Sequence, residues 1–214
     1  MAHATHFAFF RRVRKRFPRF FVGDIRVLDI GSLDINGNNR RFFRPTCRYV
    51  GLDLGEGRNV DVVCVAHEYA EPSGSFDVVL SSNALEHDMY FAKTLVNMVR
   101  LVRPGGLMFF QATHRYRAHG LARKTPQDSP FTSKIPGWDN YFRNVTVEMV
   151  REVLDLETLF TEHLLEYPEG TKDIAFWGVR SDNSFIAVPS DKSNAIHRPL
   201  EEVAENVNSG ENDV

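Results

Sequence analysis

Residues 26–37 read RVLDIGSLDING, a short apolar run that ends in an acid and passes directly into a glycine turn. The same order returns at residues 49–57, YVGLDLGEG, so that Asp29 and Asp53 each stand at the end of an expected strand. A carboxylate that is buried without a partner costs stability. We therefore interpret both acids as groups that hold something polar.

The rest of the chain alternates strand-like and helix-like segments. Strands are expected at 26–30, 48–53, 60–65, 76–81, 107–113, 161–167 and 174–180, and the run 184–188 competes for the last place. Helices are expected at 38–44, at 91–102 before Pro104-Gly105-Gly106, and from an N-cap at Thr146 to about Leu156. This order predicts an α/β fold, a doubly wound and mostly parallel sheet with helices on both faces.

In such sheets, ligands bind beyond the carboxyl ends of the strands, at the point where the strand order reverses. Asp29, Asp53, Ser81 and Thr113 all fall at expected strand ends. Their convergence at one edge of the sheet is the main reason to expect a binding site there.

Composition places the chain among ordinary globular proteins. It has 214 residues, a net charge of −2 and 43% hydrophobic residues, which suits one main domain. No apolar run approaches the roughly 18 residues of a membrane span, and the start lacks a secretory pattern, so we expect a cytoplasmic protein. In that compartment Cys47 and Cys64 are better interpreted as free thiols than as a disulfide. The sequence favours no particular oligomeric state.

Three regions are expected along the chain. Residues 1–24 form a basic, aromatic arm or helix, residues 25–189 the main domain, and residues 190–214 a polar tail expected to be disordered. The six basic residues within 11–19 could bind phosphates or a membrane surface. They could equally lie on the solvated side of a helix whose Phe side packs on the domain. The net charge near zero favours the packed helix over a dedicated nucleic-acid binder.

The glycine turn at 31–37, GSLDING, narrows the class of ligand. A dinucleotide site needs G-x-G-x-x-G, so that a pyrophosphate can lie on a helix N-terminus. Asp34 in this turn would repel a pyrophosphate but tolerate a ligand with an ammonium and a sulfonium. Asp53 is placed to accept hydrogen bonds from both hydroxyls of a ribose.

Four stretches occur in the order VLDIGS, YVGLDL, FDVVLSSNALEH and LVRPGGLMFF. Because of these four stretches, the chain resembles the class I S-adenosylmethionine-dependent methyltransferases, in the methyltransferase-type-11-like branch. The resemblance covers about residues 25–181. The resemblance implies a Rossmann-like seven-stranded sheet with an antiparallel last strand, and S-adenosyl-L-methionine as cofactor. It also implies cofactor contacts: Asp29, Gly31 and Ser32 at the methionine end, Asp53 and Leu54 at the ribose and adenine, Ser82 and Asn83 beside the reacting methyl group.

The chain departs from this family in two places. The second glycine of the usual turn is lost and Gly37 arrives late. The acid that often ends the third strand and accepts from the adenine amino group is replaced by Val65. The backbone near Ala66 or the side chain of His67 is expected to take over that contact.

Methyl transfer to a hydroxyl needs alignment and a general base. Similar proteins carry a His-Gly in the loop after strand five and a Tyr-aromatic-Arg-Asn run before the last helix, so His119 is the first candidate base and His114 the second. Tyr141 and Arg143 would orient the acceptor, and His87, expected to begin the helix after strand four, is a further candidate. The alternatives are that His119 is a solvated loop residue and that His87 only caps its helix.

Residues 120–140 form a Pro- and Ser-rich stretch without periodicity, which we interpret as a lid over the acceptor pocket. Trp138 and Trp177 are interpreted as packing or rim residues rather than cofactor stackers. The histidines lack H-x-x-x-H or Cys-His spacing, so no metal site is expected.

The function predicted first is O-methylation of a sugar hydroxyl of a glycan or nucleotide-sugar, a glycan modification with a small-molecule or glycan acceptor. It rests on the polar acceptor region and on the association of similar proteins with surface-glycan synthesis. One alternative is an RNA or nucleic-acid methyltransferase that uses the basic arm. A nucleic acid is the less favoured partner, because SSNA stands where base amino-methylation needs N/D-P-P-Y/F. The other alternative is a catalytically silent binding module.

Overall fold

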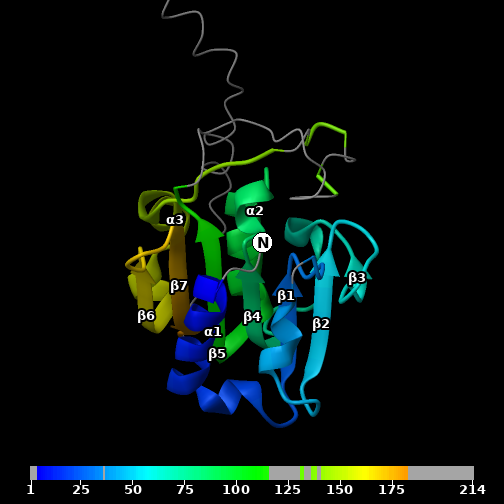
Figure 1. Ribbon diagram of the computed structural model, residues 1–214. Coiled ribbons are helices and arrows are strands. Elements are labelled where there is room, and N and C mark those ends of the chain that lie inside the picture. Colours follow the sequence, from blue (N-terminus) through cyan, green and yellow to red (C-terminus); the bar gives the residue numbers. More distant parts are fainter. Residues whose placement is uncertain (1–3, 36, 116–130, 133–135, 139–140, 183–214) are drawn as a thin grey trace, which may run out of the picture.

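The structure, a computed structural model, describes residues 4–35, 37–115, 131–132, 136–138 and 141–182. Its centre is a seven-stranded sheet in the order β3-β2-β1-β4-β5-β7-β6 (Figure 1). The strands are β1 (Arg26–Ile30), β2 (Arg48–Asp53), β3 (Val62–Val63), β4 (Phe76–Ser82), β5 (Val102–Thr113), β6 (Phe160–Glu166) and β7 (Asp173–Arg180). β1 to β5 pair in parallel, and β7 runs antiparallel to both β5 and β6. The predicted Rossmann-like sheet with an antiparallel last strand is therefore confirmed.

Helix α1 (Ala4–Arg16) covers one face of the sheet, together with the 3₁₀ helices η1 (Pro18–Phe21) and η2 (Asn39–Phe42). In Figure 1 the dark-blue helix α1 crosses in front of the sheet near β5 and β7. Its Phe side is buried, and the ring of Phe10 lies 5.0 Å from that of Phe109 on β5. On its basic side Arg12 pairs with Glu166 at 2.7 Å. The helix therefore combines a packed aromatic side with a solvated basic side.

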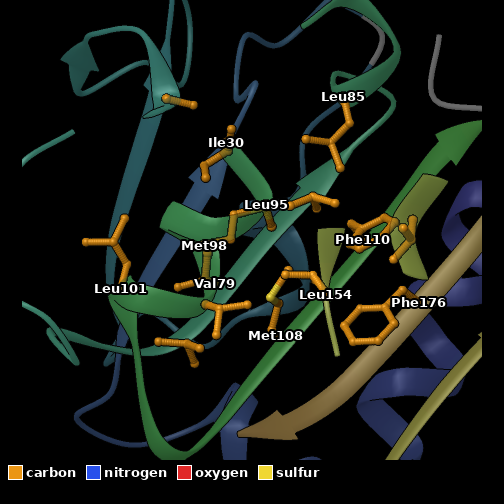
Figure 2. Packing of buried hydrophobic residues seen from close by; sticks show 14 of the residues in the cluster. Ile30, Val79, Leu85, Leu95, Met98, Leu101, Met108, Phe110, Leu154 and Phe176 are labelled. Atoms are coloured by element: carbon orange, nitrogen blue, oxygen red, sulfur yellow. The ribbon is translucent and has the colours of Figure 1, made fainter. Parts of the chain in front are cut away.

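Helices α2 (Phe91–Leu101) and α3 (Val147–Val153) cover the opposite face, and the short α4 (Leu156–Leu159) follows. Figure 2 shows how Leu95 and Met98 of α2 meet Val79 of β4 and Met108 of β5. The apolar side chains of α2 recur at helical spacing, which is why this helix buries one continuous side against the sheet. Helices on both faces agree with the fold class predicted.

Several element boundaries differ from those expected. β3 is only two residues long because it is an edge strand paired with β2 alone. β5 begins at Val102, which pairs with Phe76 on β4, so Pro104-Gly105-Gly106 is an irregularity inside the strand and not a turn before it. The segment 38–44 contains the 3₁₀ helix η2 rather than an α-helix.

Two further boundaries differ from those expected, and one of them concerns a candidate site residue. His87 ends a separate 3₁₀ helix, η4 (Leu85–His87), and does not begin the next helix. Thr146 caps α3 as expected, by accepting from the Met149 amide, but α3 ends at Val153. It ends early because Asp155 is the N-cap of α4.

Strand β1 lies between β2 and β4, so the strand order reverses here and opens a crevice at the carboxyl ends. None of the helices in the described ranges is long and apolar enough to cross a bilayer. Cys47 and Cys64 are free thiols. The run 184–188 and the tail 190–214 lie outside the described residues.

Candidate functional site

A cavity opens at the carboxyl ends of β1, β2 and β4. The space between its walls is about 1060 Å³, a volume that includes open solvent at the mouth. Nearly all of the predicted cofactor residues line it: Asp29, Gly31, Ser32, Asp53, Leu54, Ala66, Ser82 and Asn83. The sequence therefore located the cavity, although these residues come from four separate stretches.

Gly31 forms the turn after β1. Its φ is +77°, and a Cβ at this position would lie 2.1 Å from the Cβ of Ala84. The amides of Gly31 and Ser32 both donate to the carbonyl oxygen of Leu52, at 2.8 and 3.1 Å. The turn is thus tied to β2 and passes close under the connection that follows β4. Only glycine tolerates both the positive φ and the close approach to Ala84.

Asp34 is not among the residues that line the cavity, although the sequence analysis placed it in the turn that meets the ligand. Its carboxylate accepts from the Gly37 amide at 2.8 Å and from the Asn38 side chain at 2.9 Å, and it pairs with Arg58 at 2.8 Å. The hydrogen bond from Asn38 is the main reason why the pKa of Asp34 is lowered. The contacts of Asp34 therefore fix the conformation of this loop, in which the usual turn of the family has a second glycine.

Asp29 is fully buried at the end of β1. Its carboxylate accepts from the Tyr49 hydroxyl at 2.6 Å and from the Asn39 amide at 3.2 Å. Burial raises the pKa of Asp29 to about 7, against the lowering effect of these two hydrogen bonds. Sequence reasoning missed Asn39 and Tyr49 as partners, because only the fold brings the short helix η2 and strand β2 beside this acid.

Asp53 ends β2 and accepts from two loop amides, Leu33 at 2.9 Å and Leu54 at 2.7 Å. Burial raises its pKa, and the two amide hydrogen bonds oppose that effect. Each carboxylate oxygen can accept more than one hydrogen bond. Asp53 can therefore hold the loop and still accept from a ribose hydroxyl on the cavity side.

At the other end of the cavity, Ala66 lines the wall and its carbonyl accepts from Asn97 at 2.7 Å. His67 is absent from the lining, and its ring lies 4.3 Å from the ring of Tyr90. An acid that the sequence analysis overlooked, Asp88, lines this end and accepts from the Tyr90 amide at 2.7 Å. Burial raises the pKa of Asp88. Its position directly after the LEH run was the only signal available.

Three described residues of the segment 120–140 line the cavity, namely Phe131, Thr132 and Trp138. A Cβ on Gly55 would lie 2.6 Å from the Phe131 ring, so this glycine lets the ring pack directly on the loop after β2. Most of the expected lid lies outside the described residues. Trp177 packs elsewhere, with its ring 5.0 Å from that of Phe17.

The candidate catalytic residues lie in different surroundings. His87 lines the cavity, and its Nδ1 lies 3.3 Å from the Tyr141 carbonyl oxygen. Arg143 is buried, and its Nε donates to the Tyr141 hydroxyl at 2.5 Å. His114, in contrast, stacks on Tyr167 with ring centroids 4.0 Å apart. His119 lies outside the described residues.

The chain matches the family described as Methyltransferase domain over residues 1–166, and it belongs to that family. No curated protein matches the sequence. Among solved structures, the CurJ carbon methyltransferase superposes with a TM-score of 0.55 at 16% identity, covering 84% of this chain and 56% of that one.

Two further structures have comparable similarity. The phosphoethanolamine N-methyltransferase 2 of Haemonchus contortus gives a TM-score of 0.54 at 18% identity, over 80% of this chain and 52% of that one. The 1,6-didemethyltoxoflavin-N1-methyltransferase of Burkholderia thailandensis gives 0.56 at 16% identity, over 82% and 77%. The chain thus spans only about half the length of the first two relatives. At these identities the likeness concerns the fold.

The chain is thus a methyltransferase domain, and the cofactor that its sequence resemblance implies is S-adenosyl-L-methionine. The cavity fits this cofactor in its chemistry: a fully buried acid and a half-buried acid, Asp29 and Asp53, stand at two neighbouring strand ends and suit a cationic amino acid and a ribose, and a glycine turn leaves room between them. Within the described ranges, no group of three or more His, Cys, Asp or Glu could hold a metal ion.

Proposed function

We propose that this methyltransferase transfers a methyl group to a hydroxyl of a small polar acceptor, a sugar of a glycan or nucleotide-sugar. The observation that carries the proposal is His87 in the cavity wall, with its Nδ1 3.3 Å from the Tyr141 carbonyl oxygen; Tyr141 and Arg143 are hydrogen-bonded to each other and are not among the lining residues. Side chains of this kind suit a hydroxyl-rich acceptor better than an apolar one. Relatives that act on carbon and nitrogen share the fold, so the fold leaves the acceptor atom open.

The chemistry assigned to the chain is positioning and proton transfer. The bound cofactor supplies a methyl group on a sulfonium, which is already an excellent leaving group. Asp29 and Asp53 would hold the two ends of the cofactor, with Ser82 and Asn83 beside the reacting end. The cofactor would supply the methyl group and keep the electrons of the broken carbon–sulfur bond on sulfur, and a histidine of the chain would take the proton that the acceptor hydroxyl gives up. Alignment supplies much of the rate, and the base contributes about 10²–10⁴-fold.

His119 is the proposed base, with His87 and His114 as the other candidates. His87 is favoured over His114 by its place in the cavity wall, whereas His114 packs on Tyr167. The histidine variants H119A, H87A and H114A separate the three. Loss of the base lowers kcat by about 10²–10⁴-fold without changing the affinity for S-adenosylhomocysteine. H163A, in β6, is the matched control and should leave both unchanged.

The experiment that tests the function has two stages. Calorimetric titration with S-adenosylhomocysteine should show one binding event per chain. Transfer of labelled methyl groups is then measured on a panel of UDP- and GDP-hexoses and on RNA. Binding without transfer to any sugar would overturn the sugar assignment. The absence of binding would favour a catalytically silent module.

RNA stays the second candidate because of helix α1. Arg11 and Lys15 are exposed on its solvated side and have no acidic partner among the residues described. A steep dependence of RNA binding on salt, lost in the variant R11Q/K15Q, would favour this acceptor. RNA binding that does not depend on salt would exclude RNA as the acceptor.

A further inference from the structure

Glu86 is a buried acid that the methyl-transfer chemistry above does not use. It is only 2% exposed, and its Oε1 accepts from the Thr113 hydroxyl at 2.8 Å. Its Oε2 is buried and has no hydrogen-bond partner in the part of the chain that the structure describes. A buried carboxylate oxygen without a partner is costly, and such a group calls for an explanation. Glu86 also lies within hydrogen-bond distance of the Asn83 side chain, at 3.4 Å.

The hydrogen bonds around Glu86 have a fixed direction. A threonine hydroxyl has one proton, and that of Thr113 goes to Glu86, so the hydroxyl oxygen is left to accept. The side-chain nitrogen of Asn83 lies 3.5 Å from this oxygen and 3.4 Å from Glu86 Oε1. The side-chain NH2 group of Asn83 therefore lies on the side of Glu86 and Thr113, with one N–H directed between their two oxygens. The carbonyl oxygen of Asn83 then points the other way.

The backbone holds this arrangement against the cavity. Asn83 follows β4 with a φ of +50°, and its main-chain amide donates to the Gln111 carbonyl at 2.8 Å. The Arg143 amide donates to the Glu86 carbonyl at 2.8 Å, and the Val145 amide to the Thr113 carbonyl at 2.9 Å. Asn83 itself lines the cavity, at the carboxyl end of β4. An Asn83 carbonyl oxygen turned away from Glu86 and Thr113 is available to a ligand in the cavity as a hydrogen-bond acceptor.

We propose that Glu86 and Thr113 are positioning residues that turn Asn83, and that Asn83 Oδ1 accepts the hydrogen bond of the acceptor hydroxyl before methyl transfer. The proposal rests on the proposed function and adds a selection rule. An acceptor that carries an O–H or N–H at the reacting atom is held, whereas a carbon nucleophile without such a donor gains nothing from Asn83. A hydroxyl held in this way is also aligned with the methyl group.

The first test compares T113V with T113S, using a UDP- or GDP-hexose that the wild type methylates. T113V removes the hydroxyl and frees the Asn83 amide, so KM for the hexose should rise about three- to tenfold, the worth of one hydrogen bond. The affinity for S-adenosylhomocysteine should stay within twofold. T113S keeps the hydroxyl and should restore the wild-type KM. Equal KM values in T113V and the wild type would overturn the proposal.

E86Q separates positioning from proton transfer. A glutamine keeps an oxygen for Thr113 and Asn83, so E86Q should retain KM within about threefold and an unchanged pH profile of kcat. A hundredfold loss of kcat in E86Q, with T113V active, would make Glu86 the base and overturn the positioning role.

A spectroscopic measurement needs no acceptor and so remains decisive even if no sugar is methylated. The side-chain amide signals of Asn83, labelled with ¹⁵N and assigned by their loss in N83D, should shift in T113V and stay in place in T113S. Unchanged Asn83 signals in T113V would refute the arrangement itself. Shifted signals together with no sugar turnover by the wild type would instead refute only the sugar assignment.

Discussion

Asp29 gives the sharpest prediction on stability, because it is a fully buried acid whose pKa is raised from 3.8 to about 7. Below pH 3.8 the carboxyl is protonated in both the folded and unfolded chain, and it costs nothing. Between pH 3.8 and 7 only the unfolded chain is ionised, so folding becomes less favourable as the pH rises. Above pH 7 the carboxyl is ionised in both states, and it lowers the free energy of unfolding no further.

The slope of this effect is about 1.4 kcal/mol per pH unit, and over the whole window it reaches about 4 kcal/mol as an upper bound. In D29N the ionisation is gone. The free energy of unfolding of D29N minus that of the wild type should therefore rise steadily from pH 4 to pH 7 and then level off. A constant offset from the altered hydrogen bonds to Tyr49 and Asn39 does not affect the slope.

The assay is urea denaturation of both proteins at pH 5, 6, 7 and 8, followed by tryptophan fluorescence. D24N, at an exposed acid that pairs with Arg48, is the matched control for removal of a carboxylate. A difference between D29N and the wild type that stays constant between pH 5 and 7 would refute the reasoning. Calorimetry on the same variants should show that D29N binds S-adenosylhomocysteine about 10- to 100-fold more weakly, because a charged hydrogen-bond acceptor is lost.

Three other variants test the packing around the cavity and the sheet. G31A should lose cofactor binding in calorimetry, because its Cβ meets Ala84 at 2.1 Å, and G31A/A84G should recover it only in part since φ stays at +77°; full binding by G31A would contradict the role of the turn. G55A should displace Phe131, whose ring lies 2.6 Å from the added Cβ, and should weaken S-adenosylhomocysteine binding to the level of F131A; binding tighter than in F131A would show that the ring adapts. F10A should lower the free energy of unfolding by about 3–5 kcal/mol, since this ring is fully buried against the sheet; a loss under 1 kcal/mol in denaturation would mean that α1 is not part of the core.

The sequence predicted the strands whose signals are local. β1 and β2 have the expected boundaries because each is an apolar run that ends at an acid and a glycine turn. The third strand could not be placed so well, because an edge strand forms only as far as its single neighbour extends. The early start of β5 also escaped prediction, since it depends on the pairing of Val102 with Phe76 across the sheet.

For the site, the sequence supplied the residues and the fold supplied their partners. The strand-end acids and the glycine turn could be named because their spacing along the chain carries the signal. Asp34 was used to narrow the class of ligand, because no local pattern shows that its carboxylate binds Gly37, Asn38 and Arg58. The contact of Glu86 with Thr113 could not be predicted, because it joins residues 27 positions apart.

The amino-acid sequence by itself determined the class of fold and the edge of the sheet where the cavity opens, and its family resemblance indicated the cofactor, because these follow from patterns of a few consecutive residues. Only the tertiary structure decided how each acid is used. Whether a carboxylate is ionised, oriented or left with a free oxygen depends on burial and on donors such as Tyr49 and Asn39, which come from other elements. Those donors are brought together by the folding of the sheet, and no local pattern records them.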